Sequence, residues 1–181
     1  VQYDASAFTG PVLGPGWPST FPRAGIVAPV TALMVDEGRV SPGATARVAN
    51  PARQAAGAFA ALLRDRGLNV KVVRKGAAAA EASTVGTVSS PPIATLVQRT
   101  LTESDNDLAG LSGQDRVTAR TIAAALSRAA AGSDAAASII NAGLAVAGFT
   151  GTLADRFTKP GTRDADGVVR GMTGTLTGVS A

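Results

Sequence analysis

An α+β fold, with helices and short strands combined in one chain, is what the sequence predicts, and three observations support it. Apolar residues recur at helical spacing after Ser90. Short segments rich in valine stand at 70–73 and 168–172. Stretches rich in Gly and Pro separate these segments, and helices followed by strands in this order are typical of a mixed helix-and-sheet domain.

The composition indicates a folded chain with a core of small side chains. Its 181 residues are enough for one domain, or one and a part, with a buried core. Hydrophobic residues make up 45% but aromatic residues only 4%, so Ala, Val, Leu and Ile must form most of that core. Charged residues, at 17%, are too few for the highly charged kind of disorder.

Two residue types that carry much of enzyme chemistry are absent from the sequence. Without cysteine there is no disulfide, no thiol nucleophile and no Cys-ligated metal. Without histidine there is no Ser-His-Asp triad and no His-ligated metal. The acidic residues show no spacing typical of a metal site, and no cofactor is predicted. An enzyme built from this chain would have to move protons with Lys, Ser, Tyr, Asp or Glu.

The net charge of +4 is concentrated in one part of the chain. Between Arg39 and Lys75 there are eight Lys or Arg residues against one acid, Asp65, which gives +7 locally. A solvated basic face is the interpretation we favour, although an anionic polymer, a lipid or nucleic acid could meet such a patch. Nucleic acid is not expected, because the patch lacks interleaved aromatic residues for base stacking. No apolar run reaches the ~20 residues of a membrane span, so no transmembrane segment is predicted.

Loops, a short strand and a linker are predicted in the first half of the chain. Residues 1–31 are interrupted repeatedly by Pro and Gly, and Trp17 and Phe21 are expected to pin this loop to a core. The valine-rich segment 70–73 is predicted to be a strand. The Ala-, Ser- and Gly-rich segment 76–89 is expected to be a boundary or a connecting segment.

A helix is predicted at residues 50–67. Asn50 can cap it, Pro51 suits its first turn, and Gly67 can end it in the left-handed conformation. Its expected apolar face consists of Ala56, Phe59, Leu62 and Leu63.

Further helices are predicted in the second half of the chain. The clearest follows Ser90, and its apolar face consists of Ile93, Leu96, Val97, Thr100 and Leu101. The next is expected to be capped by Thr118, with a face formed by Ile122, Ala125, Leu126 and Ala129. A third is predicted at 135–142. A turn-rich segment at 148–157 and strands at 168–172 and 176–180 are expected to follow.

Two short motifs stand in this second half, and each is a weak signal alone. Ser104-Asp105-Asn106 follows the helix predicted after Ser90 and, taken by itself, is typical of the polar C-terminal end of a helix. Met172-Thr173-Gly174-Thr175 falls between the two predicted strands, where a glycine allows a bulge or close packing. Ser-Asp-Asn and Lys-Thr-Gly occur together with Ser-x-x-Lys in the penicillin-interacting serine enzymes.

The sequence around both motifs resembles the S13 family of D-alanyl-D-alanine carboxypeptidases, the low-molecular-mass class C penicillin-binding proteins. The similar segments come in the family's order and cover residues 90–181 densely. They are 90–101, 104–112, 115–118, 144–148, 151–153, 156–157, 168–170 and 173–179. Residues 1–75 resemble the domain that the family inserts between its first and second motifs. The Ala- and Arg-rich composition resembles that of actinobacterial, and in particular mycobacterial, members.

The resemblance implies a fold, a domain division and partners. The fold would be the serine β-lactamase/penicillin-binding type, an antiparallel sheet flanked by helices, plus part of an inserted domain. Residues 1–89 would be the remnant of the inserted domain with connecting loops, and 90–181 would be part of the transpeptidase-like domain. Peptidoglycan stem peptides would be the substrates and β-lactam antibiotics acylating inhibitors. The expected location is extracytoplasmic, in the periplasm or cell wall.

The resemblance also assigns roles to the motif residues. In the family a serine attacks the carbonyl between two D-alanines, and water then hydrolyses the acyl-enzyme. Ser104 would relay a proton toward the leaving amine, and Asn106 would hydrogen-bond the substrate backbone. Thr173 would bind the terminal carboxylate, Gly174 would leave room for the substrate as an added strand, and Thr175 would supply an oxyanion-binding N–H.

The nucleophile of this family has no counterpart in the sequence. No Ser-x-x-Lys occurs, because Leu68, Val72 and Arg156 stand three residues before the lysines, which are Lys71, Lys75 and Lys159. In the family this motif precedes the inserted domain. The sequence is therefore expected to be an interior piece of a longer protein.

A second departure concerns the third motif. Met172 stands where the family has lysine, and a thioether provides no cationic anchor for a carboxylate. Arg170, two residues earlier on the same face of a strand, is one candidate to supply the charge. Two functions remain open: a serine carboxypeptidase or endopeptidase, and a non-catalytic penicillin-binding-like module that binds or scaffolds the cell wall.

Overall fold

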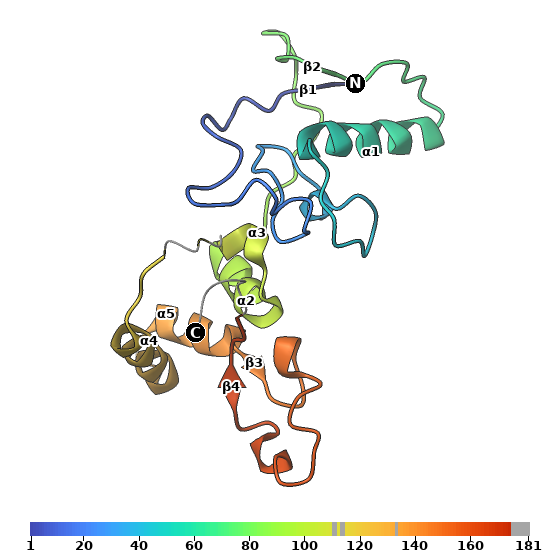
Figure 1. Cartoon of the computed structure of the whole chain (residues 1–181). Coiled ribbons are helices and arrows are strands. Elements are labelled where there is room, and N and C mark those ends of the chain that lie inside the picture. Colours follow the sequence, from blue (N-terminus) through green and yellow to red (C-terminus); the bar gives the residue numbers. More distant parts are fainter. Residues whose placement is uncertain (110–111, 113–114, 133, 175–181) are drawn as a thin grey trace. The chain divides into compact units, whose positions relative to one another are not determined.

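In the part of the chain that the structure describes, helices are combined with two small two-stranded sheets, so the predicted α+β class is confirmed (Figure 1). The computed structural model describes residues 1–109, 112, 115–132 and 134–174. The strand predicted at 176–180 and the candidate residue Thr175 lie outside these residues. Contacts divide the chain into two units, Val1–Val88 and Ser89–Ala181, which are described separately.

The first unit is mostly loop around one long helix, as the Pro- and Gly-rich sequence predicts. Phe21, Val27 and Ala28 are buried, so Phe21 anchors the loop as expected. Trp17 is half-buried and lies against Gly14, where a Cβ would come within 2.8 Å of the indole ring. The indole therefore packs on bare backbone, and Gly14 is the residue that permits it.

The long helix of this unit, α1 (Pro51–Asp65), has the ends that the sequence predicts. The Asn50 side chain accepts a hydrogen bond from the Arg53 backbone N–H at 2.9 Å, and Pro51 occupies the first turn. Gly67 follows the helix with a φ of +84°, a conformation that glycine adopts without steric cost.

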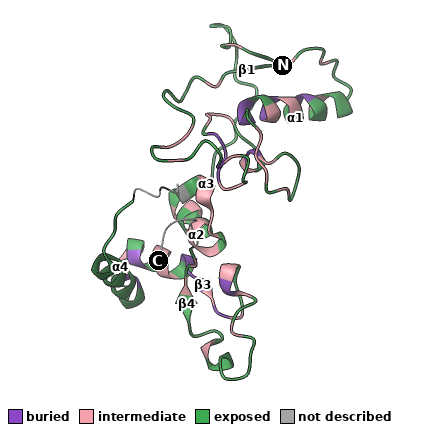
Figure 2. Cartoon of the chain, viewed as in Figure 1, coloured by how far each residue is buried: buried purple, intermediate pink, exposed green. Residues whose placement is uncertain are grey.

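The apolar face of α1 is only partly the predicted one, since Ala56 is buried and Leu63 half-buried but Phe59 and Leu62 are exposed. Its buried residues are Pro51 and a row of alanines, namely Ala52, Ala55, Ala56 and Ala60. Phe59 and Leu62 are instead 55% and 52% exposed. Alanine lets the helix approach the loops closely, and burial stops at Ala60, so the larger side chains lie beyond the covering loops. Figure 2 shows this change along α1 from its buried start to its exposed end.

A short parallel ladder joins the start of this unit to the segment after α1. Strand β1 (Gln2–Tyr3) pairs with β2 (Arg74–Lys75), with Gln2 opposite Arg74. The strand predicted at 70–73 is therefore displaced toward the C-terminus. The position of β1 explains this displacement. Val1, just before β1, donates a hydrogen bond of 2.7 Å to the Val72 carbonyl and accepts one of 3.1 Å from the Arg74 N–H, so the pairing of β1 begins at Arg74.

The second unit contains the three helices predicted for it: α2 (Ile93–Glu103), α4 (Ala119–Ala131) and α5 (Ala135–Gly143). A fourth, short helix, α3 (Asn106–Ala109), follows α2 directly. Helix α5 packs against both α2 and α4 (Figure 1). None of the helices in the described part of the chain is long and apolar enough to cross a membrane.

The predicted apolar faces of α2 and α4 are only partly buried. On α2, Ile93 is 79% exposed and Val97 is 36% exposed. On α4, Ile122 is 52% exposed, whereas Ala129 is 1% exposed. The contacts are made instead where small residues let the helices approach closely, as on α1.

Helices α2 and α5 meet at Gly143, the last residue of α5. A Cβ at this position would lie 2.8 Å from the Gln98 Cα and 3.1 Å from the Leu101 Cδ1. The Thr102 hydroxyl donates a hydrogen bond of 2.6 Å to the Gly143 carbonyl. Backbone contact and hydrogen bond together fix the C-terminal half of α2 on α5.

An antiparallel pair of strands follows α5. Strand β3 (Ala145–Val146) pairs with β4 (Arg170–Gly171), and the pairing continues through a hydrogen bond of 2.9 Å from the Ala147 N–H to the Val169 carbonyl. The sequence predicts β4 within 168–172 but not β3, whose apolar run continues that of the helix before it. Between them lies the expected turn-rich segment with the 3-10 helix η2 (Gly151–Leu153).

Substitution of Gly143 tests the close packing of α2 on α5. We expect Gly143→Ala to lower the free energy of unfolding by about 1–3 kcal/mol, because the added methyl group has to push the two backbones apart. Gly57→Ala on α1 is the matched control, since a Cβ there meets nothing within 4 Å. It should stabilise the protein by up to about 1 kcal/mol. Equal effects of both changes in urea unfolding would contradict the packing.

The pH at which α5 loses its cap provides a second test. Asp134 accepts hydrogen bonds from the Ala137 N–H at 2.8 Å and from Arg128 Nε at 3.0 Å. Both hydrogen bonds lower the pKa of Asp134, and the bond from the Ala137 N–H has the larger effect. The cap should therefore be at full strength above the ordinary Asp pKa of about 4 and weaken as the pH falls through the lower, folded-state value.

Far-UV circular dichroism during acid titration measures this loss. Asp134→Asn keeps a capping oxygen that cannot be protonated. Its helix signal should therefore lack the part of the acid transition that Asp134 causes. An unchanged acid profile in this variant would show that Asp134 does not control the end of α5.

Candidate active site

Ser104, the first candidate residue, lies at the end of α2 in a left-handed backbone conformation. Its φ is 57° and its ψ is 48°, and its N–H donates a hydrogen bond to the Thr100 carbonyl. A residue other than glycine pays about 1–2 kcal/mol for this conformation. The surroundings have to hold the turn in place, and backbone strain of this kind is concentrated at functional sites in proteins.

The turn at Ser104 is held by the segment that follows α5. Gly151 lies so close to the last turn of α2 that a Cβ would come within 1.9 Å of the Thr102 carbonyl oxygen. Gly151 also has a φ of +56°, which disfavours any other residue. Thr102, two residues before Ser104, is therefore held at two points: its hydroxyl is bonded to Gly143, and its carbonyl lies against Gly151.

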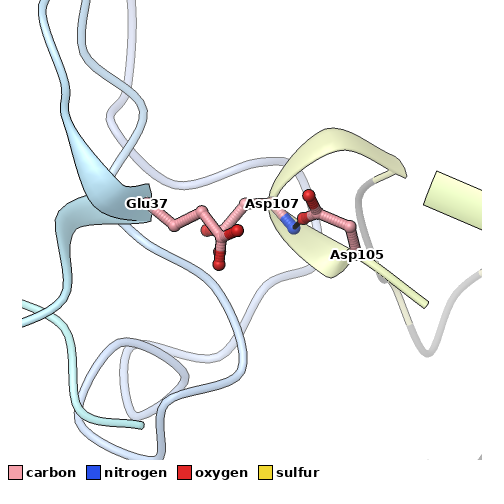
Figure 3. Close-up of side chains that lie close together, drawn as sticks. All are labelled: Glu37, Asp105 and Asp107. Atoms are coloured by element: carbon pink, nitrogen blue, oxygen red, sulfur yellow. Dashed lines mark hydrogen bonds between the residues drawn. The ribbon is translucent and has the colours of Figure 1, made fainter. Parts of the chain in front are cut away.

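Asp105, the middle residue of the motif, has a structural role. Its Oδ1 accepts hydrogen bonds from the Asp107 N–H at 3.0 Å and the Leu108 N–H at 3.3 Å. These are donors at the start of α3 that would otherwise lack helical partners. The Asp105 N–H donates a hydrogen bond of 3.2 Å to the Thr100 carbonyl, which also accepts one from the Ser104 N–H. Figure 3 shows the carboxylates of Asp105 and Asp107 at this start of α3.

The outer two residues of the motif differ from Asp105 in this respect. Ser104 and Asn106 are both half-buried. Within the described residues, neither side chain forms a hydrogen bond, whereas that of Asp105 accepts those of Asp107 and Leu108. The turn therefore presents a hydroxyl and an amide on a fixed backbone, both able to bind another molecule.

The second candidate segment follows β4. Met172 is 49% exposed, Thr173 is half-buried, and a Cβ at Gly174 would meet nothing within 4 Å. In the described part of the chain, β4 pairs only with β3. Its other edge can accept an extended peptide, and Gly174 leaves the approach open.

Strand β3 connects the two candidate segments. Helix α2 contacts both β3 and η2, and β3 pairs with β4, which leads directly into Met172. The structure thus brings Ser104 and Asn106 together in one turn, and Met172, Thr173 and Gly174 together at one strand end. No hydrogen bond between described residues joins the two segments.

Arg170, the candidate replacement for the absent lysine, lies on β4. Its guanidinium donates a hydrogen bond of 3.3 Å to the Asn141 carbonyl on α5. The side chain is exposed, so this single long bond does not bury its charge. Arg170 therefore keeps a positive charge two residues from Met172.

Sequence reasoning missed the two glycines that position the motif. Neither Gly143 nor Gly151 carries a chemical group, and their role depends on backbone that comes from α2, some 40 to 50 residues earlier in the sequence. The cap formed by Asp105 did leave a signal, since Asp is a preferred residue immediately before a helix.

Comparison with known proteins finds similarity to one family of peptidases. Residues 106–181 match the family described as the D-Ala-D-Ala carboxypeptidase 3 (S13) family. The whole chain aligns with carboxypeptidase Rv3627c of Mycobacterium tuberculosis at 29% identity and with carboxypeptidase DacB of Mycolicibacterium smegmatis at 28% identity. The resemblance to the S13 family is therefore confirmed.

The extent of these matches is limited in two ways. The chain spans 49% of the length of each of these two relatives. No solved structure matches the chain. The α+β class is thus established by the helices and sheets described above, and the penicillin-binding fold remains a prediction.

Glycine at position 104 tests whether the motif turn is strained. We expect Ser104→Gly to raise the free energy of unfolding by up to about 1 kcal/mol, because glycine adopts positive φ without steric cost. Ser104→Ala removes the same hydroxyl but keeps the Cβ, so it should not stabilise the protein. Equal stability of the two variants in urea would contradict the left-handed geometry.

Proposed function

We propose that the chain, which is similar to the S13 D-Ala-D-Ala carboxypeptidases, forms part of a serine D,D-carboxypeptidase of the cell wall. Its substrates would be peptidoglycan stem peptides that end in D-Ala-D-Ala, and β-lactams would acylate the same nucleophile. This reaction takes place outside the cytoplasmic membrane, where peptidoglycan lies. Endopeptidase action on cross-linked peptides would use the same site.

The observation that carries this proposal is the Ser104–Asn106 turn. A serine and an asparagine without partners among the described residues flank an aspartate that caps α3. A purely structural helix end would need the aspartate alone. The strain at Ser104 and its support by Gly143 and Gly151 are also expected of a turn that has to present one hydroxyl in one place.

The proposed reaction proceeds in two steps. A serine oxygen attacks the carbonyl carbon between the two D-alanines, the C–N bond breaks, and the terminal D-alanine leaves as its amine. Water then attacks the ester, restoring the serine and releasing the shortened peptide. Ser104 would pass a proton to the leaving nitrogen, and Asn106 would hydrogen-bond the peptide backbone.

The second segment would hold the end of the peptide. The substrate would add as a strand along the open edge of β4, with Gly174 leaving space for its backbone. The Thr173 hydroxyl would bind the terminal carboxylate, and the Thr175 N–H would stabilise the oxyanion. Arg170 would replace the positive charge that Met172 lacks. The proposal assigns the nucleophile to polypeptide outside residues 1–181, because no Ser-x-x-Lys occurs within them.

The alternative is a non-catalytic module that binds the cell wall. Met172 favours it, since a half-exposed thioether stands where the reaction uses an ammonium group. Such a module would still bind a peptide along β4 but would not break it.

Acylation by a penicillin tests the proposal. Protein purified from its native source should gain the mass of one penicillin and should release D-alanine from a peptide ending in D-Ala-D-Ala. Ser104→Ala should lower the rate of acylation by about 10²–10⁴-fold, the usual contribution of a proton-transfer group. Ser127→Ala, an exposed serine on α4, is the control and should have no effect. A folded protein with neither acylation nor D-alanine release would contradict the proposal.

Lysine at position 172 separates an enzyme from a binding module. If the site is catalytic, Met172→Lys should accelerate acylation, and Arg170→Gln should slow it in the natural protein but much less in the Met172→Lys variant. Acylation rates of the four combinations measure this dependence. A binding module would show no acylation in any of them.

A further inference from the structure

The exposed end of the first unit carries apolar and basic side chains on one continuous segment, residues 59–74, here called the basic–apolar end. Phe59 and Leu62 lie on the exposed half of α1, and Leu68 and Val72 follow in the loop; all four are between 52% and 59% exposed. Large side chains exposed this closely together are typical of interaction surfaces.

Basic residues are interleaved with these apolar side chains. They are Arg64, Arg66, Lys71 and Arg74, all exposed, and Asp65 is the one acid in the segment. Among the described residues, none of the four forms an ion pair. Their positive charges are therefore left for an external partner.

Hydrogen bonds hold this segment in a defined shape. Arg64 Nε donates to the Val70 carbonyl at 2.8 Å, which folds the loop back on the helix. Arg66 donates to the Leu62 carbonyl at 3.3 Å, and the Leu68 N–H donates to the Leu63 carbonyl at 3.0 Å. The two arginine bonds go to uncharged backbone carbonyls, so they position the side chains without neutralising their charges.

A hollow of about 460 Å³ lies between this segment and the first two residues of the sequence. Its lining consists of Val1, Gln2, residues 69–72 and Arg74. Lys71 and Arg74 provide the charged side chains of this lining, and both are positive. The hollow therefore suits a compact anionic group such as a phosphate headgroup.

From this arrangement we propose that the basic–apolar end docks on an anionic lipid surface. Charge alone would suit any polyanion, and exposed apolar side chains alone would suit any apolar partner. Both together, on the end of α1 and the loop after it, match the boundary between charged headgroups and acyl chains. The apolar side chains enter the boundary while the arginines and lysine contact phosphates.

Co-sedimentation with vesicles tests this inference. The protein should bind vesicles of equal parts phosphatidylglycerol and phosphatidylcholine, should bind pure phosphatidylcholine far less, and should dissociate as salt is added. Arg66→Gln with Lys71→Gln should weaken binding about twentyfold, since each basic residue near such a surface contributes roughly fivefold. Leu62→Ser with Leu68→Ser should also weaken it, by roughly tenfold.

A matched control lies on α4, where Arg120 and Ile122 are likewise exposed. Arg120→Gln with Ile122→Ser should leave vesicle binding unchanged. Binding that ignores lipid charge, or that responds equally to the α4 variant, would overturn the inference. If soluble polyphosphate binds as tightly and the Leu62/Leu68 variant binds vesicles normally, the surface recognises a polyanion and the lipid proposal is wrong. Circular dichroism of each variant verifies that the helices remain.

Discussion

The close approach of the last turn of α2 to Gly143 and Gly151 is the contact on which the candidate site depends. Both glycines stand where a Cβ would collide with α2, at Gln98 and at Thr102 respectively. The backbone after Thr102 therefore has little freedom, and it turns through a left-handed serine into α3. A strained residue persists only where its surroundings determine it in this way.

Within the turn, structural and chemical roles are divided among three adjacent residues. Asp105 satisfies the N–H groups at the start of α3. Ser104 and Asn106 are thereby placed at fixed positions on either side of it. In the proposed reaction, these fixed positions would reduce the entropy lost when a substrate binds, which is how positioning contributes to catalysis. The same division explains why an aspartate stands between two residues of the proposed reaction without taking part in it.

Local signals in the sequence predicted much of the fold. The caps at Asn50 and Thr118 depend on a few neighbouring residues, and both were found where predicted. The buried faces of the helices were harder to predict, because they depend on what covers each helix. On α1, for example, Ala52 and Ala60 are buried while Phe59 is exposed. Short strands were hardest. The position of β2 depends on its pairing with β1, and β3, which the sequence did not predict, consists of only two small apolar residues shortly after α5.

The candidate site was predicted from motifs rather than from geometry. Resemblance to the motifs of the S13 family pointed to Ser104, Asn106, Thr173 and Gly174, but not to the backbone that holds them. That backbone comes from glycines distant in the sequence, and a glycine gives no sign of which neighbour requires its lack of a side chain. A single sequence therefore indicates residues with distinctive chemistry more readily than it indicates the contacts that position those residues.

Hydrogen exchange at the Ser104 and Asp105 amides tests whether packing on Gly143 and Gly151 holds the Ser104 turn in place. Both N–H groups share the Thr100 carbonyl as acceptor, and the turn that carries them is fixed by its packing on Gly143 and Gly151. The account predicts that both amides exchange slowly, as slowly as the amides in the middle of α2. Exchange of both at the rate of an unfolded chain, while the middle of α2 stays protected, would mean that the turn opens freely and that the packing does not hold Ser104 in place.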